Sequence, residues 1–265
     1  MLNPVKSIEA RYLTYKAAHF SSFPEGRALA ALKGIHAGKR CFIIGNGPSL
    51  RAADLDTLEQ SGEITFAFNR IFHIFDQTAW RPTYYISQDG KMLAGSVEEV
   101  KRIEAEIKFI PAELAWYEGI RIPGAQLFHI VNEEIAENVP AFSENIAQKI
   151  CNSKTVVYTA VQIAVYMGIR EIYLIGVDHH FHTSMNEKGE IVVDPTAKDY
   201  FSENYNRDKD QLYIPNTDVS TKTFFAAKQY ADAHGIRICN ATRGGKLEVF
   251  ERADFDSLFI RSEGN

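Results

Sequence analysis

The sequence predicts an α/β fold in which a mostly parallel sheet carries helices on both faces and a lid-like insertion. Apolar runs typical of buried strands alternate with helix-like segments along most of the 265 residues. Several of these runs end in small or polar residues, as strands do at the edge of a parallel sheet where ligands bind. With 45% hydrophobic and 24% charged residues, the chain is expected to form one sizeable α/β core.

Charge and cysteine content exclude several classes of function. The formal net charge of −5 argues against nucleic acid as the main partner. No apolar run reaches membrane-spanning length and residues 1–20 lack a signal-peptide core, so we expect no membrane span and a cytoplasmic location. Cys41, Cys151 and Cys239 form no CxxC pair, which predicts neither a disulfide framework nor a zinc site. The oligomeric state stays open, a homo-oligomer included.

Two parts are predicted along the chain. Residues 1–38 are expected to form a helical lead-in, and residues 39–262 a single Rossmann-like, nucleotide-binding catalytic domain. Within the lead-in, the amphipathic pattern of residues 7–33 breaks near Pro24, a residue suited to the first turn of a second helix.

The first predicted strand leads into a loop of small residues. Phe42–Ile44 are β-formers without a polar break, as expected of a strand buried on both faces. Gly45 and Gly47 permit positive φ and let a phosphate or ribose approach the main chain. This pattern indicates an anion or nucleotide site, although it matches neither the full dinucleotide fingerprint nor a P-loop.

The loop is expected to pass directly into a helix over residues 52–58. Pro48 suits a first helical turn because it lacks an N–H group, and Ser49 can cap the helix. The N-terminus of this helix would then point at the bound group.

The remaining elements follow the same alternation. Strands are expected at 64–70, 83–87, 107–110, 127–131, 171–178 and 236–240, and helices at 97–106, 156–167 and 221–234. Residues 132–143 lack periodicity and are interpreted as the irregular, lid-like insertion, and residues 188–211 as a mobile loop over the site.

Polar residues recur where the predicted strands end. They are Asn46, Asn69, Ser87, Asp89, Asp178 and Asn240. Amides suit ribose hydroxyls or a base edge, and carboxylates can hold a divalent cation, orient a hydroxyl or act as a base. Asn and Asp are also common turn formers, so their recurrence at one edge predicts the site. Thr155, before the predicted helix 156–167, is a further binding candidate.

Three histidines, His179, His180 and His182, directly follow Asp178. A histidine with a pKa near neutrality can take a proton from an acceptor hydroxyl or give one to a leaving phosphate. We therefore predict that Asp178 and one of these histidines carry the chemistry. Their spacing on a loop does not match a metalloprotease helix, so no metal site is predicted from them.

Basic and aromatic residues of the C-terminal half offer further anion contacts, although charged loops are commonly just solvated. The side chains that could close over a phosphate are Tyr205, Arg207, Lys209 and Tyr213. A second candidate anion-binding segment is Arg243–Lys246.

Several of these motifs together resemble one protein family. They are Gly45–Leu50 (GNGPSL), Asn69, Tyr173–His179 (YLIGVDH) and Asn240–Leu247 (NATRGGKL). In them the sequence resembles the MptE-like family, named after archaeal 6-hydroxymethylpterin diphosphokinase, which also contains the motility-accessory-factor glycosyltransferases that decorate flagellin. The first motif and residues 168–178 are also similar to bacterial sialyltransferases that use CMP-sialic acid.

The resemblance implies roles for individual residues. As in the sialyltransferases, Asn46, Gly47, Ser49 and Asn69 would bind the cytidine nucleotide. The base histidine of those enzymes has no counterpart in residues 213–218, so the cluster after Asp178 would have to supply it. A pterin diphosphokinase would instead use ATP and Mg²⁺, with acidic residues such as Asp89 and Asp178 holding the metal.

Three functions follow. The first is a glycosyltransferase that uses a nucleotide-activated, CMP-linked sugar, requires no cofactor, and builds a surface glycan or modifies a protein. The second is an ATP-dependent 6-hydroxymethylpterin diphosphokinase, and the third a nucleotide-binding accessory protein without turnover. The predicted binding residues are Gly45, Asn46, Gly47, Pro48, Ser49, Asn69, Ser87, Asp89, Thr155 and Asn240.

Overall fold

The computed structural model describes residues 4–202, 205 and 214–260, and a parallel sheet of eight strands forms its centre. The strands lie in the order β14-β13-β10-β1-β2-β3-β4-β5, and every neighbouring pair is parallel. In chain order they are β1 (Arg40–Ile44), β2 (Ile64–Phe68), β3 (Tyr84–Ile86), β4 (Ile107–Pro111), β5 (Gln126–Phe128), β10 (Glu171–Ile175), β13 (Arg237–Asn240) and β14 (Glu251–Arg252). The predicted Rossmann-like α/β fold is confirmed.

The strand order reverses beside β1. From β1 the chain proceeds outward on one side through β2 to β5, and then returns to the other side of β1 with β10, β13 and β14. Ile44 at the end of β1 pairs with Ile175 of β10 on one side and with Ala67 of β2 on the other. The carboxyl ends of these three strands therefore meet at the switch point where open α/β sheets bind ligands.

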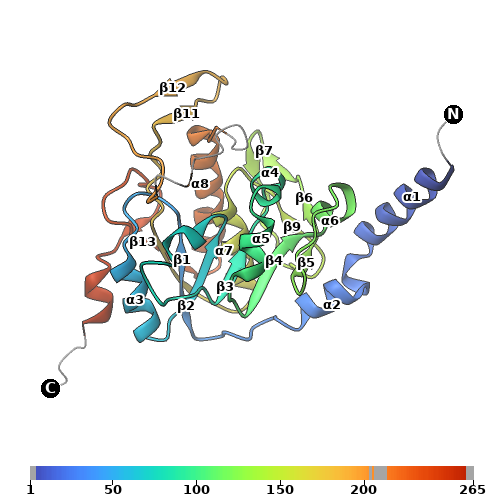
Figure 1. Ribbon diagram of the computed structural model, residues 1–265, viewed down its shortest axis with the longest axis horizontal. Coiled ribbons are helices and arrows are strands. Elements are labelled where there is room, and N and C mark those ends of the chain that lie inside the picture. The colour runs from blue at the N-terminus through green and yellow to red at the C-terminus, as the bar shows by residue number, and fades with distance from the viewer. Residues whose placement is uncertain (1–3, 203–204, 206–213, 261–265) are drawn as a thin grey trace.

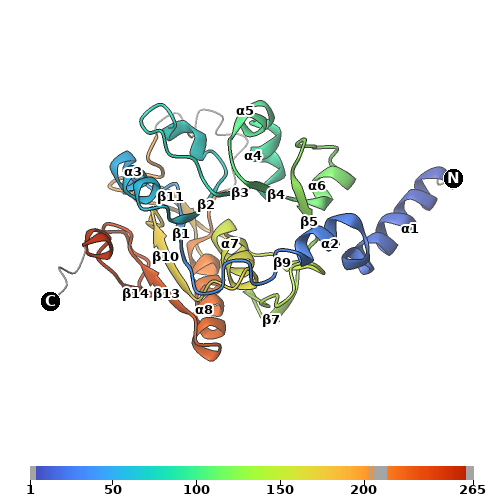
Figure 2. The same cartoon turned by 90° about the horizontal axis from the view of Figure 1, so that it is seen from below.

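Helices cover both faces of the sheet, as Figure 2 shows. One face carries α3 (Ala52–Gln60), α4 (Gly90–Ala94) and α5 (Val97–Arg102), and the other carries α7 (Val156–Tyr166) and α8 (Thr217–Ala233). The short helix α6 (Ala112–Tyr117) follows β4. Two separate apolar clusters fill the two layers between sheet and helices.

The sequence of β1 explains why it lies at the centre. Cys41 and Ile43 pack against the α7 and α8 side, while Phe42 and Ile44 pack against the α3 side, and all four are fully buried. A strand buried on both faces needs an uninterrupted apolar run. The α7 helix is almost wholly buried for the same reason, and it ends where Gly168 adopts a φ of +92°.

The N-terminal segment contains α1 (Pro4–Ala18), the short 3-10 helix η1 (Phe20–Ser22) and α2 (Pro24–Ala30). Pro24 opens α2, as predicted. The α1 helix extends away from the sheet (Figure 1), whereas α2 lies against β5. Gln126 Nε2 donates a hydrogen bond of 2.9 Å to the backbone oxygen of Glu25, which fastens α2 to the edge strand.

Three small sheets extend the fold. They are β6 (Ile130–Val131) with β9 (Ile150–Cys151), the hairpin β7 (Glu134–Ala136) with β8 (Val139–Pro140), and the hairpin β11 (Thr183–Met185) with β12 (Ile191–Val193). The strand predicted at 127–131 is thus divided between β5 and β6, and the segment 132–143 is a hairpin rather than irregular. Within the described part of the predicted loop 188–211, β12 adds a strand that the sequence pattern did not indicate.

Capping side chains account for two differences from the predicted helices, whereas α5 differs by ending at Arg102, before the predicted residue 106. The α8 helix begins at Thr217, before the predicted residue 221, because the Asn216 side chain accepts a 2.9 Å hydrogen bond from the backbone N–H of Val219. The α4 helix was not predicted, and Asp89 caps it by accepting from the Met92 N–H.

None of the helices within the described ranges combines the length and apolar character that crossing a bilayer requires. All three cysteines are free and buried in the core.

Candidate functional site

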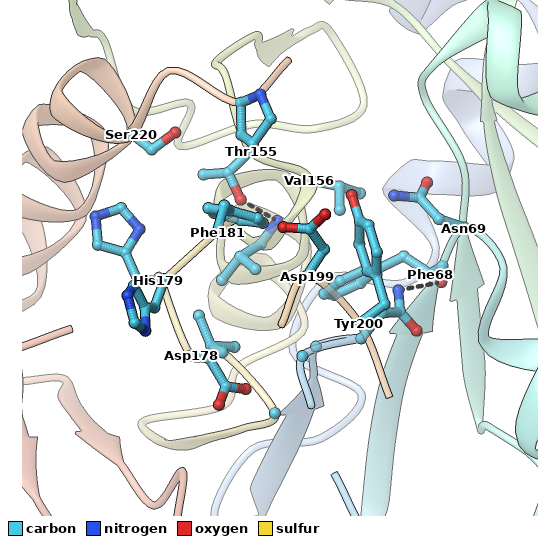
Figure 3. Close-up of a pocket in the computed structure, with 18 of the residues that line it drawn as sticks. Phe68, Asn69, Thr155, Val156, Asp178, His179, Phe181, Asp199, Tyr200 and Ser220 are labelled. Carbon is cyan, nitrogen blue, oxygen red and sulfur yellow. Dashed lines mark hydrogen bonds between the residues drawn. The ribbon is translucent and has the colours of Figure 1, made fainter. Parts of the chain in front are cut away.

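A cavity of about 200 Å³ lies at the carboxyl ends of β10, β1 and β2, and we call it the central cavity. Its lining includes Gly45, Asn46, Gly47, Phe68, Asn69, Lys154, Thr155, Val156, Val157, Gly176, Val177, Asp178, His179, His180, Phe181, Asp199, Tyr200, Tyr205, Ser220 and Phe224. Figure 3 shows Asp178 and His179 on one side of it and Phe68 and Asn69 on the opposite side. The switch point of the sheet therefore carries a real cavity.

The glycines of the loop after β1 allow this loop to lie close to the loop after β10. Neither Gly45 nor Gly47 adopts a positive φ, contrary to the conformational reason predicted for them. A Cβ on Gly45 would instead collide with the backbone oxygen of Gly176, and one on Gly47 with the carboxylate of Asp178. The Gly47 N–H donates to the Gly176 oxygen over 2.8 Å, so the loops after β1 and β10 are joined directly.

Pro48 and Ser49 do not begin the α3 helix. The residue that caps α3 is Arg51, and it makes no capping hydrogen bond through its side chain. Ser49 Oγ instead donates a 2.7 Å hydrogen bond to Asp178 Oδ2. Within the described chain, no residue of α3 lines the central cavity, whereas the first residues of α7 do. The prediction that the helix after the glycine loop points at the ligand is therefore wrong for α3.

The N-terminus of α7, which is the positive end of the helix dipole, and a neighbouring cation border the central cavity. Thr155 caps the helix by accepting a hydrogen bond from Val157 N over 3.3 Å. Lys154, just before it, is exposed and lines the cavity, and it makes no ion pair within the described residues. A lysine at a helix N-terminus is repelled by the positive end of the helix dipole, and a bound anion offsets this repulsion. This end of the cavity is therefore suited to a phosphate or carboxylate.

Asp178 is a buried carboxylate on the wall of the cavity, with only 8% of its surface exposed. Burial raises the pKa of Asp178 above its usual range, and the hydrogen bond from Ser49 opposes that rise. The side chain is thus held in place by the glycine loop rather than presented freely to solvent.

Two asparagines bring unpaired oxygens to the cavity. Asn46 is 7% exposed, and its Nδ2 donates to the Phe68 backbone oxygen over 3.0 Å and lies 3.3 Å from the Tyr205 hydroxyl. Asn46 Oδ1 and Asn69 Oδ1 are buried without a hydrogen-bond partner in the described structure. Buried polar atoms are nearly always paired, so these two oxygens are expected to accept hydrogen bonds from a ligand.

His179 has a defined tautomer. The Thr221 hydroxyl donates its only proton to the Thr217 oxygen over 2.8 Å, so it accepts in its 2.7 Å contact with His179 Nε2. His179 therefore carries its proton on Nε2 and leaves a lone pair on Nδ1. Burial lowers the pKa of His179 below its usual value, which keeps the ring neutral at neutral pH.

The other two histidines are placed differently. His180 lines the cavity, and its Nε2 lies 2.8 Å from Asp194 Oδ2 and 2.9 Å from Lys246 Nζ. His182 is exposed, does not line the cavity, and contacts the Thr183 hydroxyl at 3.1 Å. Of the three candidates, the structure brings His179 and His180 to the site.

Besides Pro48 and Ser49, three predicted binding residues do not line the cavity, namely Ser87, Asp89 and Asn240. Ser87 is buried behind the end of β3, where its N–H donates to the Phe109 oxygen. Asp89 caps α4. Asn240 is fully buried, and its amide bonds to Leu247 O at 2.8 Å and Thr242 N at 3.0 Å. Asp89 and Asp178 therefore do not meet in one cavity.

Of the residues predicted to bind an anion, some line the cavity and others do not. Tyr205 covers the cavity and stacks on Tyr200 with ring centroids 3.9 Å apart, whereas Arg207, Lys209 and Tyr213 lie outside the described residues. Arg243 does not line the cavity, and its guanidinium is bound by the carboxylates of Asp54 and Asp256.

The sequence interpretation missed Lys154, Asp199 and Tyr200. A signal was present for Lys154, because a basic residue directly before a capping threonine is unfavourable unless an anion is near. Among the described residues, no group of three or more His, Cys, Asp or Glu side chains is arranged to hold a metal ion.

Comparisons with known proteins place this chain among related folds. It is similar to the MAf glycosyltransferase from Magnetospirillum magneticum AMB-1, with 15% identity, a TM-score of 0.51, and coverage of 89% of this chain and 39% of that one. It is also similar to the sialyltransferase CstII from Campylobacter jejuni, solved with cytidine-5'-monophosphate, with 16% identity, a TM-score of 0.46, and coverage of 83% and 86%. At such low identity the MAf likeness shows the fold alone, and this chain spans well under half of the MAf chain. A search of curated proteins found no match.

A family model gives the more specific result. The model described as 6-hydroxymethylpterin diphosphokinase MptE-like matches residues 17–184, a span that includes β1, β2, β10 and the histidine loop. Since this match covers more than half of the chain, the protein belongs to the 6-hydroxymethylpterin diphosphokinase MptE-like family.

Proposed function

We propose that the protein is a glycosyltransferase that moves a sugar from a CMP-linked donor to a hydroxyl of a glycan or protein. One observation carries the proposal. The glycine loop with its unpaired asparagine oxygens, the α7 N-terminus with Lys154, and the neutral His179 all line a single cavity. The MAf glycosyltransferase shares the fold, which is consistent with sugar transfer but does not by itself argue for it.

The donor nucleotide would be held by groups of matching chemistry. Asn46 Oδ1 and Asn69 Oδ1 would accept from ribose hydroxyls or from the exocyclic amine of the base. The phosphate would lie at the α7 N-terminus, where Lys154 and the helix dipole offset its charge. Such an arrangement needs no metal to bind a nucleoside monophosphate.

The transfer itself requires a proton acceptor. The acceptor hydroxyl oxygen forms a bond to the anomeric carbon while the bond from that carbon to the phosphate oxygen breaks, and the electron pair leaves with CMP. His179 Nδ1 would take the hydroxyl proton, because its lone pair is free and its lowered pKa keeps it unprotonated. Thr221 is a positioning residue that fixes this tautomer.

Diphosphoryl transfer from ATP to a hydroxymethylpterin is the second candidate, because the family model carries that description. Its Mg²⁺ was expected between Asp89 and Asp178, but Asp89 caps α4 outside the central cavity. The residues present therefore do not fit the predicted metal site. A nucleotide-binding accessory protein is the third candidate.

Thermal unfolding with CMP, CDP, UDP, GDP and ATP, each with and without Mg²⁺, tests these candidates. A ligand that binds the native state alone raises the midpoint of unfolding. We expect CMP to do so without Mg²⁺. If ATP stabilises the protein only with Mg²⁺, and cytidine nucleotides do not stabilise it, the result would instead support diphosphoryl transfer.

Turnover separates the transferase from the accessory protein. The measurement is release of CMP from a CMP-linked sugar, by chromatography, for the native protein and for His179→Gln. Cytidine binding without CMP release, and no change in the glycan when His179→Gln replaces the native protein in cells, would indicate an accessory protein.

A further inference from the structure

A second cavity, of about 230 Å³, lies beside the central one, and we call it the side cavity. Its wall is formed by the β7–β8 hairpin, by residues 152–154 and by α8. Lys154 lines both cavities, so the two cavities share part of their wall. A ligand in the side cavity would therefore lie next to one bound at the α7 N-terminus.

The first turns of α8 also link the two cavities. Ser220 lines the central cavity, while Val219 and Thr223 line the side cavity. Thr221, between them in sequence, holds His179 through the 2.7 Å contact with Nε2. The proposed base is thus fastened to the helical turn that divides the two cavities.

The lining of the side cavity is polar but weakly charged. Eight of its ten lining residues are polar or charged, among them the amides of Asn132, Asn138 and Asn152, and the two apolar ones are Pro140 and Val219. Asn152 Nδ2 donates to Asn132 Oδ1 over 2.9 Å, and Asn152 Oδ1 accepts from Ser153 N, so Asn138 has the amide with both groups left for a ligand. Amides both donate and accept, which suits hydroxyl groups, and the apolar pair offers a surface for the C–H face of a sugar ring.

The charges of the lining decide which ligands fit. Two carboxylates, Glu133 and Glu134, line the side cavity with a single cation, Lys154, and Glu133 is already paired with Lys149 at 2.5 Å. The remaining carboxylate, Glu134, and the cation Lys154 balance each other, so the lining has no net charge that would attract an anionic group. It suits a neutral, hydroxyl-rich group.

The Asn138 side chain is one amide of the lining that no other described residue binds. It lies at the turn of the hairpin with a φ of +59°, and its backbone N–H donates to Glu134 Oε2 over 3.2 Å. Its side-chain amide makes no hydrogen bond to any other described residue. The backbone is fixed while the amide stays available.

We propose that the side cavity is the acceptor subsite and binds the neutral terminal saccharide of a glycan, a hexose or an N-acetylhexosamine. The inference rests on the proposed function, because a saccharide is the second substrate only if the enzyme transfers a sugar to a glycan. The bound saccharide would present its hydroxyl toward the central cavity past Lys154, where His179 can take the proton.

Saturation-transfer NMR with the full chain tests the subsite. The ligands are the methyl glycosides of galactose, glucose, N-acetylglucosamine, N-acetylgalactosamine and sialic acid, each titrated with and without CMP. We expect at least one neutral glycoside to bind in the presence of CMP, and the sialic acid glycoside not to bind. Asn138→Gly removes the amide at a position whose positive φ favours glycine, so the turn is kept.

The matched control is Glu137→Ala, next in sequence, exposed, and absent from the lining. Asn138→Gly should weaken the neutral glycoside about fivefold, as loss of one or two neutral hydrogen bonds does, and Glu137→Ala should leave it unchanged. The inference is overturned by no neutral glycoside binding, by CMP displacing the glycoside, or by both variants having the same effect. Failure of the proposed function gives a different result: either cytidine nucleotides do not stabilise the protein, or the protein binds them and releases no CMP from a CMP-linked sugar.

Discussion

Ser49 Oγ donates a 2.7 Å hydrogen bond to Asp178 Oδ2, although the two residues are 129 positions apart in the sequence. The bond joins the loop after β1 to the loop after β10, and both loops line or support the central cavity. It also supplies a partner to a carboxylate that burial otherwise penalises.

Removing that bond should destabilise the protein in a pH-dependent way. In Ser49→Ala the buried Asp178 carboxylate loses its donor, and we expect a loss of about 1–3 kcal/mol in unfolding free energy at neutral pH. The pKa of Asp178 is already raised by burial, so its ionisation disfavours folding as pH rises through the ordinary aspartate range. The loss should therefore shrink near pH 4, where about half of the carboxyl groups of ordinary aspartates are protonated. Urea unfolding at both pH values, with the exposed Ser61→Ala as control, measures the difference.

Gly45→Ala should destabilise the fold through a backbone collision. The added Cβ would meet the backbone oxygen of Gly176, which cannot rotate away as a side chain can. We expect a loss of about 3 kcal/mol or more, above the usual range for overpacking. Gly62→Ala is the comparison, because Gly62 has a φ of +64° and open space around it, and strain there should cost about 1 kcal/mol. Equal losses in the two variants would contradict the close approach of the two loops.

The pH dependence of CMP release should reflect the protonation of His179, the proposed base. Because burial lowers its pKa, the ring stays neutral at neutral pH, and kcat/KM should fall only in acid, with an apparent pKa below about 6.5. His179→Gln should lower kcat by about 10²–10⁴-fold and remove this acid limb. His182→Gln is the matched control, since His182 is exposed and lies outside the cavity. A profile unchanged in His179→Gln would exclude His179 as the base.

Lys154→Met should weaken nucleotide binding while keeping the length of the side chain. Lys154 is exposed, so its attraction to a phosphate is partly screened, and we expect a loss of about 3–10-fold in affinity for CMP. The difference between native protein and variant should narrow as salt is raised. Isothermal titration at two ionic strengths checks this, with Lys188→Met on the β11–β12 hairpin as control.

The fold was predictable because the central strands are short apolar runs with nothing polar inside them. Cys41–Ile44 and Ile172–Ile175 are buried on both faces. A strand buried on both faces must consist of apolar residues, and such a run is visible in the sequence. Helix starts were predicted less well. Asn216 and Asp89 cap helices through their side chains, and the sequence alone did not show that these polar residues were caps rather than loop or site residues.

For polar residues at strand ends, the prediction of the candidate site was correct only for those that follow the three neighbouring strands β10, β1 and β2. Asn46, Asn69 and Asp178 follow three strands that are neighbours in the sheet, so their side chains reach one cavity. Ser87 follows β3 and Asn240 is the last residue of β13; both strands lie one position further out, and the two residues serve the flanking structure instead. Which strands are neighbours is decided by long-range pairing, which has no local signature in the sequence.

The pairing of β1 with β10 also determines when the protein can finish folding. Arg40 pairs with Glu171, about 130 residues later, whereas β2, the other neighbour of β1, follows it closely. During synthesis β1 leaves the ribosome with one edge unpaired, and its partner is complete only when about two thirds of the 265 residues have been made. The nascent chain must therefore keep an apolar strand edge from pairing wrongly until then. No ligand of the central cavity can assist, because half of that cavity does not yet exist.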